Sequence, residues 1–117
     1  MLSEKRISGN LAEDKACSFL EAKGLKIIRR NYAARVGEID IIASDGEELC
    51  FIEVKSSKGG FLPPELKVNK TKQKKIIKTA SIYMEREGKN FNAFRFDVIT
   101  FDRDEVRYYR DAFMADI

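Results

Sequence analysis

Apolar and polar residues alternate through the middle of the chain, over residues 37–55. The side chains of a strand point to opposite faces in turn, so this alternation predicts β-strands with one buried face. The dipeptide Asp45-Gly46 falls between the two alternating runs and is typical of a hairpin turn. The pattern therefore predicts a β-hairpin with an apolar core face, which carries Ile39, Ile41, Ala43, Cys50, Ile52 and Val54.

Other stretches of the chain have a different period. Apolar residues recur at helical spacing from Asn10 to about Lys23, and again from an N-cap at Asn69 to about Glu87. The expected order is α-β-β-β-α-β-β, an α/β fold in one domain over residues 1–117. A right-handed crossover through the second helix should lay the next strand parallel to the hairpin's second strand. The further strands are expected over residues 25–32, 91–101 and 106–113.

The second face of the hairpin is apolar near its turn and ionic far from it. Ile42, Leu49 and Phe51 need a cover, whereas the far end carries three acids and one lysine. Like charges on one sheet face cost stability unless something positive neutralises them. A divalent metal would complete the balance, and a solvated charged face is the alternative. The charged residues are Glu38, Asp40, Glu53 and Lys55.

The strand register decides whether the two inner carboxylates meet. With Asp45-Gly46 as the turn, Ser44 pairs with Glu47. Asp40 and Glu53 are then diagonal neighbours, roughly 7–8 Å apart, which is close enough for both carboxylates to hold one ion. A slip of one residue would turn Asp40 to the other face of the sheet.

Lysines are concentrated at the start of the second predicted helix, without an intervening acid. Lysine at a helix N-terminus opposes the helix dipole, and the cost makes sense if an anion binds there. Helix amides and ammonium groups together suit the phosphates of a DNA backbone. A solvated lysine-rich face is the alternative. The nucleic-acid-binding candidates are Lys70, Lys72, Lys74 and Lys75, with Gln73 and Lys58 as weaker ones.

The amino-acid composition excludes several kinds of catalytic and metal site. The chain has no histidine, which excludes histidine triads, histidine bases and histidine metal ligands. Its two cysteines, Cys17 and Cys50, lack a paired spacing and are expected to be buried thiols. The net charge of +3 permits nucleic-acid binding without requiring it. A signal-type N-terminus and an apolar run of membrane length are both absent from the sequence, so a cytoplasmic protein is expected.

Two segments of the hairpin carry a resemblance to a known nuclease signature. Gly37-Glu38-Ile39-Asp40, followed by Phe51-Ile52-Glu53-Val54-Lys55, resembles the Asp…Glu-x-Lys signature of the PD-(D/E)XK nucleases. More closely, the chain is similar to the YraN or UPF0102 family of endonuclease-like proteins, which resemble archaeal Holliday-junction resolvases in fold. The other matching segments are Gly9-x-x-Ala12-Glu13, Arg30-Asn31-Tyr32, Val68 to Lys72, Arg95-Phe96-Asp97-Val98 and Ala112-Phe113.

This resemblance implies a restriction-endonuclease-like αβββαβ core, in which helices flank a mixed central sheet. It also implies metal-dependent hydrolysis of DNA phosphodiester bonds, with branched or repair-intermediate DNA as a substrate class. Asp40, Glu53 and the main-chain carbonyl of Val54 would hold Mg²⁺ or Mn²⁺, hard ions that suit oxygen ligands. Lys55 would position the attacking water or stabilise the charge of the transition state.

Two positions qualify the resemblance. Glu13 would support the metal site, but with Asn10 as N-cap it is also the third residue of a capping box, and both interpretations stay open. The family commonly has an arginine two residues beyond the lysine of its signature, where this chain has Ser57. A phosphate contact there is in doubt, with Lys58 as a substitute, while Lys72 matches a recurrent lysine of the family.

The sequence is also compatible with two other functions. One is a non-catalytic nucleic-acid-binding module that retains the nuclease fold. Another is a protein-interaction subunit of a repair or uptake assembly, in which the lysine-rich helix meets an acidic partner. The expected partner is DNA through its phosphate backbone, no membrane is expected, and a homodimer is left open.

Overall fold

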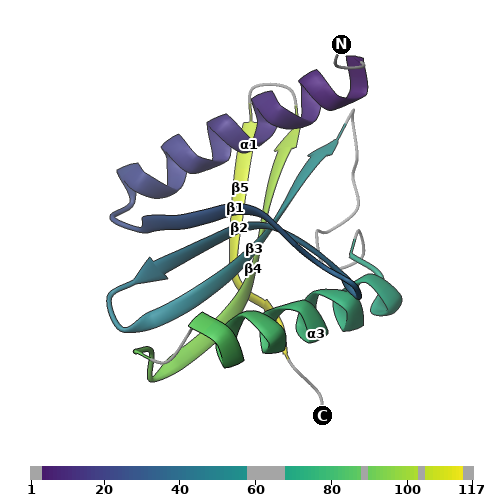
Figure 1. Ribbon diagram of the computed structural model, residues 1–117. Helices are drawn as coiled ribbons and strands as arrows, with labels where there is room; N and C mark the ends of the chain where they lie inside the picture. Colours follow the sequence, from purple (N-terminus) through teal and green to yellow (C-terminus); the bar gives the residue numbers. More distant parts are fainter. Residues whose placement is uncertain (1–3, 58–67, 88–89, 103–104, 115–117) are drawn as a thin grey trace.

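The computed structural model describes residues 4–57, 68–87, 90–102 and 105–114 (Figure 1). The described elements follow the predicted order of helices and strands. None of the helices in these ranges is long and apolar enough to cross a membrane. The elements are α1 (Glu4–Ala22), β1 (Lys26–Ala34), β2 (Gly37–Asp45), β3 (Glu48–Ser57), α3 (Lys70–Glu87), β4 (Ala93–Asp102) and β5 (Glu105–Phe113).

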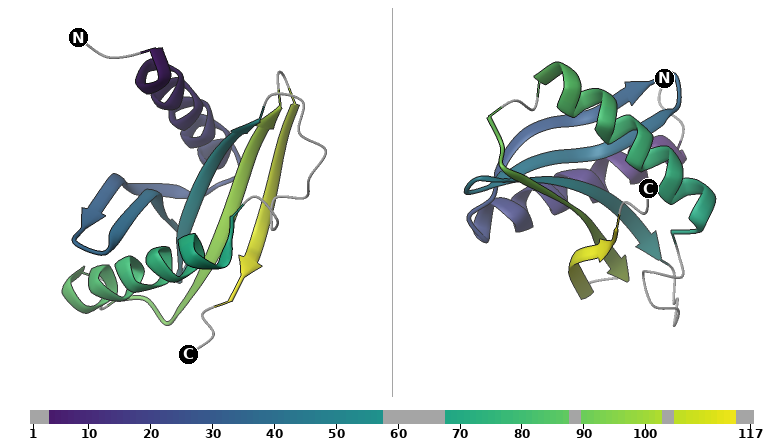
Figure 2. Two further views of the ribbon diagram at one scale, coloured as in Figure 1. Left: turned by 90° about the vertical axis from the view of Figure 1, so that its right-hand side faces the viewer. Right: turned by 90° about the horizontal axis from the view of Figure 1, so that it is seen from below.

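The strands form one mixed sheet in the order β1-β2-β3-β4-β5. β3 and β4 are parallel, as predicted, because α3 carries the chain back between them, and the other pairs are antiparallel. α1 covers one face of the sheet and α3 the other (Figures 1 and 2). This α/β arrangement confirms the predicted fold class and is compatible with a restriction-endonuclease-like core.

Each face of the sheet has its own hydrophobic cluster. Ile41, Ala43, Cys50 and Ile52 pack under α1, as the predicted core face requires, and both cysteines are buried and free. The apolar half of the second hairpin face is covered by α3, which contributes Ile76, Ala80 and Tyr83. The prediction that this half needs a cover is confirmed. The residues that α3 covers there are Ile42, Leu49 and Phe51.

Ile39 is an exception to the predicted face assignment, because it packs in the cluster under α3. Two irregularities lie near this change of side. Asn31 in β1 has a left-handed backbone conformation, with φ of 53°. The regular pairing of β2 with β3 ends at Ile41 and Ile52. The residues of β2 before Ile41, which form its outer end, therefore do not continue the regular ladder with β3. The outer end of the β1–β2 hairpin therefore lies against α3 instead.

The register of the β2–β3 hairpin differs from the prediction by two residues. Asp45 pairs with Glu48 and Ser44 with Leu49, so the turn residues are Gly46 and Glu47. Gly46 has φ of 64°, and a two-residue turn of this kind favours glycine at its first central position. Within the paired residues, a shift by two leaves each side chain on its predicted face, because the period of a strand is two.

The helix starts were predicted with unequal success. α3 begins at Lys70, and the Lys72 amide donates to Asn69 Oδ1 at 2.8 Å, which confirms Asn69 as N-cap. α1 begins at Glu4, so Asn10 lies inside the helix and cannot cap it. The capping-box interpretation of Glu13 is therefore wrong. Local residue preference is a weak signal of a helix boundary, and here the helix continues through the expected cap.

A buried ionic network joins β4 to its neighbours. The Nε of Arg95 donates to both oxygens of Asp97 at 3.1 Å. The same guanidinium contacts Glu48 through Nη1 at 2.5 Å and Asp45 through Nη2 at 3.1 Å. Tyr108 donates its hydroxyl proton to Asp97 Oδ2 at 2.5 Å. This network ties the hairpin turn to β4 and β5 beneath α1.

Candidate metal and nucleic-acid site

The candidate site lies where β2 separates from β3. Beyond the last regular pair, the amide of Val54 donates to Asp40 Oδ2 at 2.8 Å. The carboxylate of Asp40 thus accepts a hydrogen bond from β3 at the point where the strand ladder ends. Asp40 lies next to Ile41 in β2, and Glu53 lies next to Ile52 in β3, immediately beyond this last pair. The two residues therefore lie across the strands from each other, and not diagonally as predicted.

A cavity of about 280 Å³ opens at this point. One wall is the outer part of β2 with Glu53 of β3, and the other wall is the start of α3. The close approach of the two walls depends on Gly37, where a Cβ atom would lie 2.9 Å from Thr79 Oγ1. A larger residue would push β2 away from α3. The residues that line the cavity are Gly37, Glu38, Asp40, Glu53, Lys72, Lys75 and Ile76.

Two lysines converge on Glu53, whose side chain is 5% exposed. Lys72 Nζ lies 2.6 Å from Glu53 Oε1, and Lys55 Nζ lies 3.7 Å from the same oxygen. Burial alone would lower the pKa of Lys72, but its hydrogen bond with Glu53 raises it. The pKa of Lys55 is lowered by burial and by the neighbouring Lys72 ammonium. Glu53 thus faces two ammonium groups from different elements, Lys55 on β3 and Lys72 on α3.

Asp40 is in a less favourable environment for a negative charge. Burial, with a further contribution from the charge of Glu53, raises its pKa from 3.8 to about 7. The hydrogen bond from the Val54 amide and the charge of Lys72 oppose this shift. Near neutral pH the Asp40 carboxyl is thus poised between its two protonation states, and an added cation would favour the ionised one.

Glu13 brings a third carboxyl group to this end of the sheet from α1. Its side chain is 12% exposed, and its Oε1 is buried without a hydrogen-bond partner in the described structure. Arg30 Nη2 lies 3.9 Å away, while the same guanidinium pairs more closely with Asp14 at 2.7 Å. Burial raises the pKa of Glu13, and its charge contributes to the raised pKa of Asp40. Glu13 is thus close enough to act on Asp40 electrostatically.

The donor atoms of this site suit a hard divalent cation. Carboxylate oxygens are the ligands that Mg²⁺ and Mn²⁺ prefer. The described residues contain no group of three acidic or cysteine side chains placed to hold a metal ion. The predicted ligand set of Asp40, Glu53 and the Val54 carbonyl includes two carboxylates. Glu13 offers a third, and its Oε1 has no hydrogen-bond partner in the described structure. The residues fit such an ion, and metal binding stays a prediction.

The predicted nucleic-acid contacts fall into four groups. Lys70, Lys74 and Lys75 are exposed on the first turns of α3, which has no acid in its first turn. Gln73 donates its amide hydrogen to the carbonyl of Val68 at 2.8 Å, so that its donor is used within the fold. Lys58 lies outside the described residues. The pairing of Lys72 with Glu53 was missed, because helical periodicity indicates only that a lysine is near the helix start.

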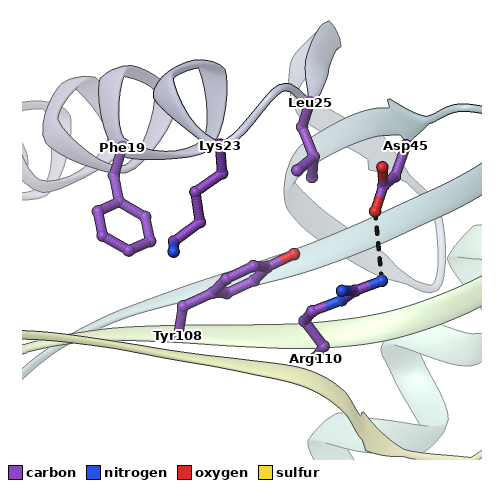
Figure 3. Close-up of a pocket in the computed structure, with 6 residues that line it drawn as sticks. All are labelled: Phe19, Lys23, Leu25, Asp45, Tyr108 and Arg110. Atoms are coloured by element: carbon purple, nitrogen blue, oxygen red, sulfur yellow. Dashed lines mark hydrogen bonds and ion pairs between the residues drawn. The ribbon is translucent and has the colours of Figure 1, made fainter.

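A second cavity, of about 530 Å³, lies under α1 beside the hairpin turn, away from Asp40 and Glu53 (Figure 3). Phe19 in the last turn of α1 and Lys23 just after the helix extend toward Tyr108 on β5, and the Lys23 ammonium lies 5.0 Å from the Phe19 ring centroid. Arg110 and Asp45 close it with an ion pair of 3.3 Å. These contacts adjoin the Arg95 network, so we assign the candidate chemistry to the smaller cavity.

Comparison with known proteins places the chain in a family. Residues 12–101 match the family model described as "Uncharacterised protein family UPF0102". A UPF0102 protein of Clostridium kluyveri is 43% identical over 112 residues, which cover 90% of this chain and 92% of the relative. A UPF0102 protein of Clostridium tetani is 42% identical over 120 residues, covering 97% and 98%. The UPF0102 protein YraN of Salmonella arizonae is 37% identical over 109 residues, covering 91% and 83%. This chain therefore belongs to the UPF0102 family, in agreement with the resemblance of its hairpin and flanking motifs.

Proposed function

We propose that this protein is a metal-dependent nuclease that hydrolyses DNA phosphodiester bonds. The observation that carries the proposal is the juxtaposition of Asp40 and Glu53 at the end of the hairpin, with Lys55 beside them. Asp40 has no ion-pair partner among the described residues, and burial together with the charge of Glu53 raises its pKa to about 7. Perturbed acids in a cleft are candidates for function, because burying them costs stability.

Each residue has a defined part in this proposal. Asp40, Glu53 and the Val54 carbonyl would hold Mg²⁺ or Mn²⁺, and Glu13 would support the charge from α1. When bound, the ion would supply Lewis acidity toward the scissile phosphate and acidify the attacking water. Lys55 would position that water or stabilise the developing charge on the phosphate. Its lowered pKa makes its ammonium a better proton donor than an ordinary lysine.

The first test is cleavage of labelled linear and branched DNA in Mn²⁺, Mg²⁺ or EDTA. We expect wild type to cleave only with metal, and both Glu53→Gln and Lys55→Ala to lose cleavage while remaining folded. Glu38→Gln is the matched control, because Glu38 lines the same cavity but is exposed, and it should retain activity. Cleavage by Glu53→Gln at the wild-type rate would contradict the proposal.

Binding of the DNA backbone should depend on the exposed lysines of α3. The test variant carries both Lys74→Gln and Lys75→Gln. For each DNA phosphate contact that it loses, the slope of log K against log salt should fall in magnitude by roughly 0.9 for duplex DNA. The control pair is Lys15→Gln and Lys26→Gln, which removes the same charge from exposed positions on α1 and β1. Equal slopes for the two double variants would mean that the lysines of α3 contact only solvent.

A non-catalytic DNA-binding module is the second candidate function. It is favoured by the pairing of Glu53 with two lysines, which satisfies that carboxylate without any metal. DNA binding that depends on the lysines of α3, together with no cleavage and no metal binding by wild type, would support this candidate instead.

A further inference from the structure

We propose that Lys72 is a resident counter-ion of Glu53, and that a divalent cation must displace it to bind the site. Lys72 and the metal would then compete for one carboxylate oxygen. This inference rests on the proposed function, since it concerns how the same site accepts its metal. It assigns Lys72 a part separate from the phosphate contact that the sequence alone suggested.

The geometry makes Lys72 the dominant partner of Glu53. Its Nζ lies 2.6 Å from Glu53 Oε1, whereas Lys55 Nζ is 3.7 Å from that oxygen. A third cation at the same oxygen would be close to both ammonium groups. Like charges at such distances repel strongly in a partly buried site. A metal ion can therefore bind Glu53 well only if one lysine moves away.

Burial indicates which of the three groups moves. The Glu53 side chain is 5% exposed and is fixed on a central strand, while the Lys72 side chain is 41% exposed. Lys72 projects from the first turn of α3, whose backbone is fixed by the Asn69 cap. Its flexible stem can carry the ammonium from Glu53 to solvent without a change in the fold. Glu53 has no such alternative, because a buried carboxylate without a cation is costly.

The displaced ammonium remains on the same surface as the exposed lysines of α3. There it can contact a DNA phosphate, which would replace the negative charge it lost at Glu53. Metal binding and DNA binding would therefore favour each other, because each stabilises the arrangement in which Lys72 has left Glu53. Such coupling is reciprocal by thermodynamic necessity. The ligands of this exchange are a divalent cation at Glu53 and a phosphate diester at Lys72.

The test is calorimetric titration of Mn²⁺ into wild type, Lys72→Met, Lys72→Arg and Lys75→Met, without DNA. Removing the competitor should tighten Mn²⁺ binding by Lys72→Met on the order of tenfold, within the usual range of coupling between two sites. Lys72→Arg retains the competing charge and should not show this gain. Lys75→Met is the matched control, because Lys75 lines the same cavity but is not an ion-pair partner of Glu53 in the described structure.

A second readout uses the protein without any metal. In EDTA, Lys72→Met should unfold at a lower urea concentration than Lys75→Met, because Glu53 keeps only the more distant ammonium of Lys55. Equal Mn²⁺ affinities for Lys72→Met and Lys75→Met would overturn the exchange while leaving the proposed metal site intact. Failure of both wild type and Lys72→Met to bind Mn²⁺ would instead overturn the metal site and the exchange with it.

Discussion

Arg95→Met is expected to lower the free energy of unfolding by about 3–5 kcal/mol, the usual cost of removing one partner from a buried ion pair. The Arg95 side chain is 4% exposed and that of Asp97 is fully buried. Methionine has a similar length but cannot donate, so among the described residues Asp97 would keep only the Tyr108 hydroxyl and the Asp111 amide. Since a domain has only about 5–15 kcal/mol of stability, a large part of it would disappear. Urea unfolding in EDTA measures the change.

Arg107→Met is the matched control for this prediction. Arg107 also pairs with a carboxylate, that of Glu105 on the same strand, but both side chains are more than half exposed. Exposed pairs contribute little to stability, so this variant should stay close to wild type. Arg95→Lys should fall between the two, because it restores the charge without the fork of donors. Equal losses for Arg95→Met and Arg107→Met would show that the Arg95 network does not hold the sheet.

Asp40→Asn is expected to make the metal-free protein more stable than wild type at neutral pH, while removing the proposed metal site. Burial raises the pKa of Asp40 to about 7 in the folded protein, against 3.8 for an unperturbed carboxyl. The stability that comes from the protonated folded form is therefore complete below about pH 4 and is lost as the pH rises toward 7. Wild type should lose up to about 1.4 kcal/mol per pH unit relative to the variant in this window.

The measurement is urea unfolding of wild type and Asp40→Asn in EDTA at several values between pH 4 and pH 8. Asparagine retains an oxygen that can accept from the Val54 amide, so the difference isolates the charge. Glu38→Gln, at an exposed position of the same cavity, should show no comparable trend. Excess Mn²⁺ should then stabilise wild type and not the variant, because a ligand stabilises the form that binds it. A pH-independent difference would mean that Asp40 is ionised throughout.

The two regions in these predictions serve different purposes within one sheet. The Arg95 network ties the turn end of the hairpin to β4 and β5 under α1. The site of Asp40 and Glu53 lies at the opposite end, where β2 leaves β3 and approaches α3. At the first end the ionic groups pair with one another, whereas at the second end Asp40 has no ion-pair partner among the described residues and Glu13 Oε1 has no hydrogen-bond partner there. This difference is why only the second region is proposed to bind a ligand.

Much of the fold could be predicted from the sequence, because it depends on neighbours along the chain. Alternation in residues 37–55 determined which hairpin side chains share a face, and that assignment survived a register shift of two because the strand period is two. Asn69 determined the start of α3 through a hydrogen bond to an amide three residues away. The order of strand, helix and strand was sufficient to predict a parallel β3–β4 pair.

The tertiary structure alone decided the features that depend on residues far apart in the chain. Nothing local to Ile39 shows that the strand end turns it toward α3, and nothing local to Asn10 shows that the helix already began at Glu4. The contact of Lys72 with Glu53 and the contacts of Arg95 with the hairpin turn join different elements. Side-chain pattern reports the direction in which a residue points. Which residue it contacts is determined by how separate helices and strands pack against one another. The same packing determines which charged groups are stabilised by a partner.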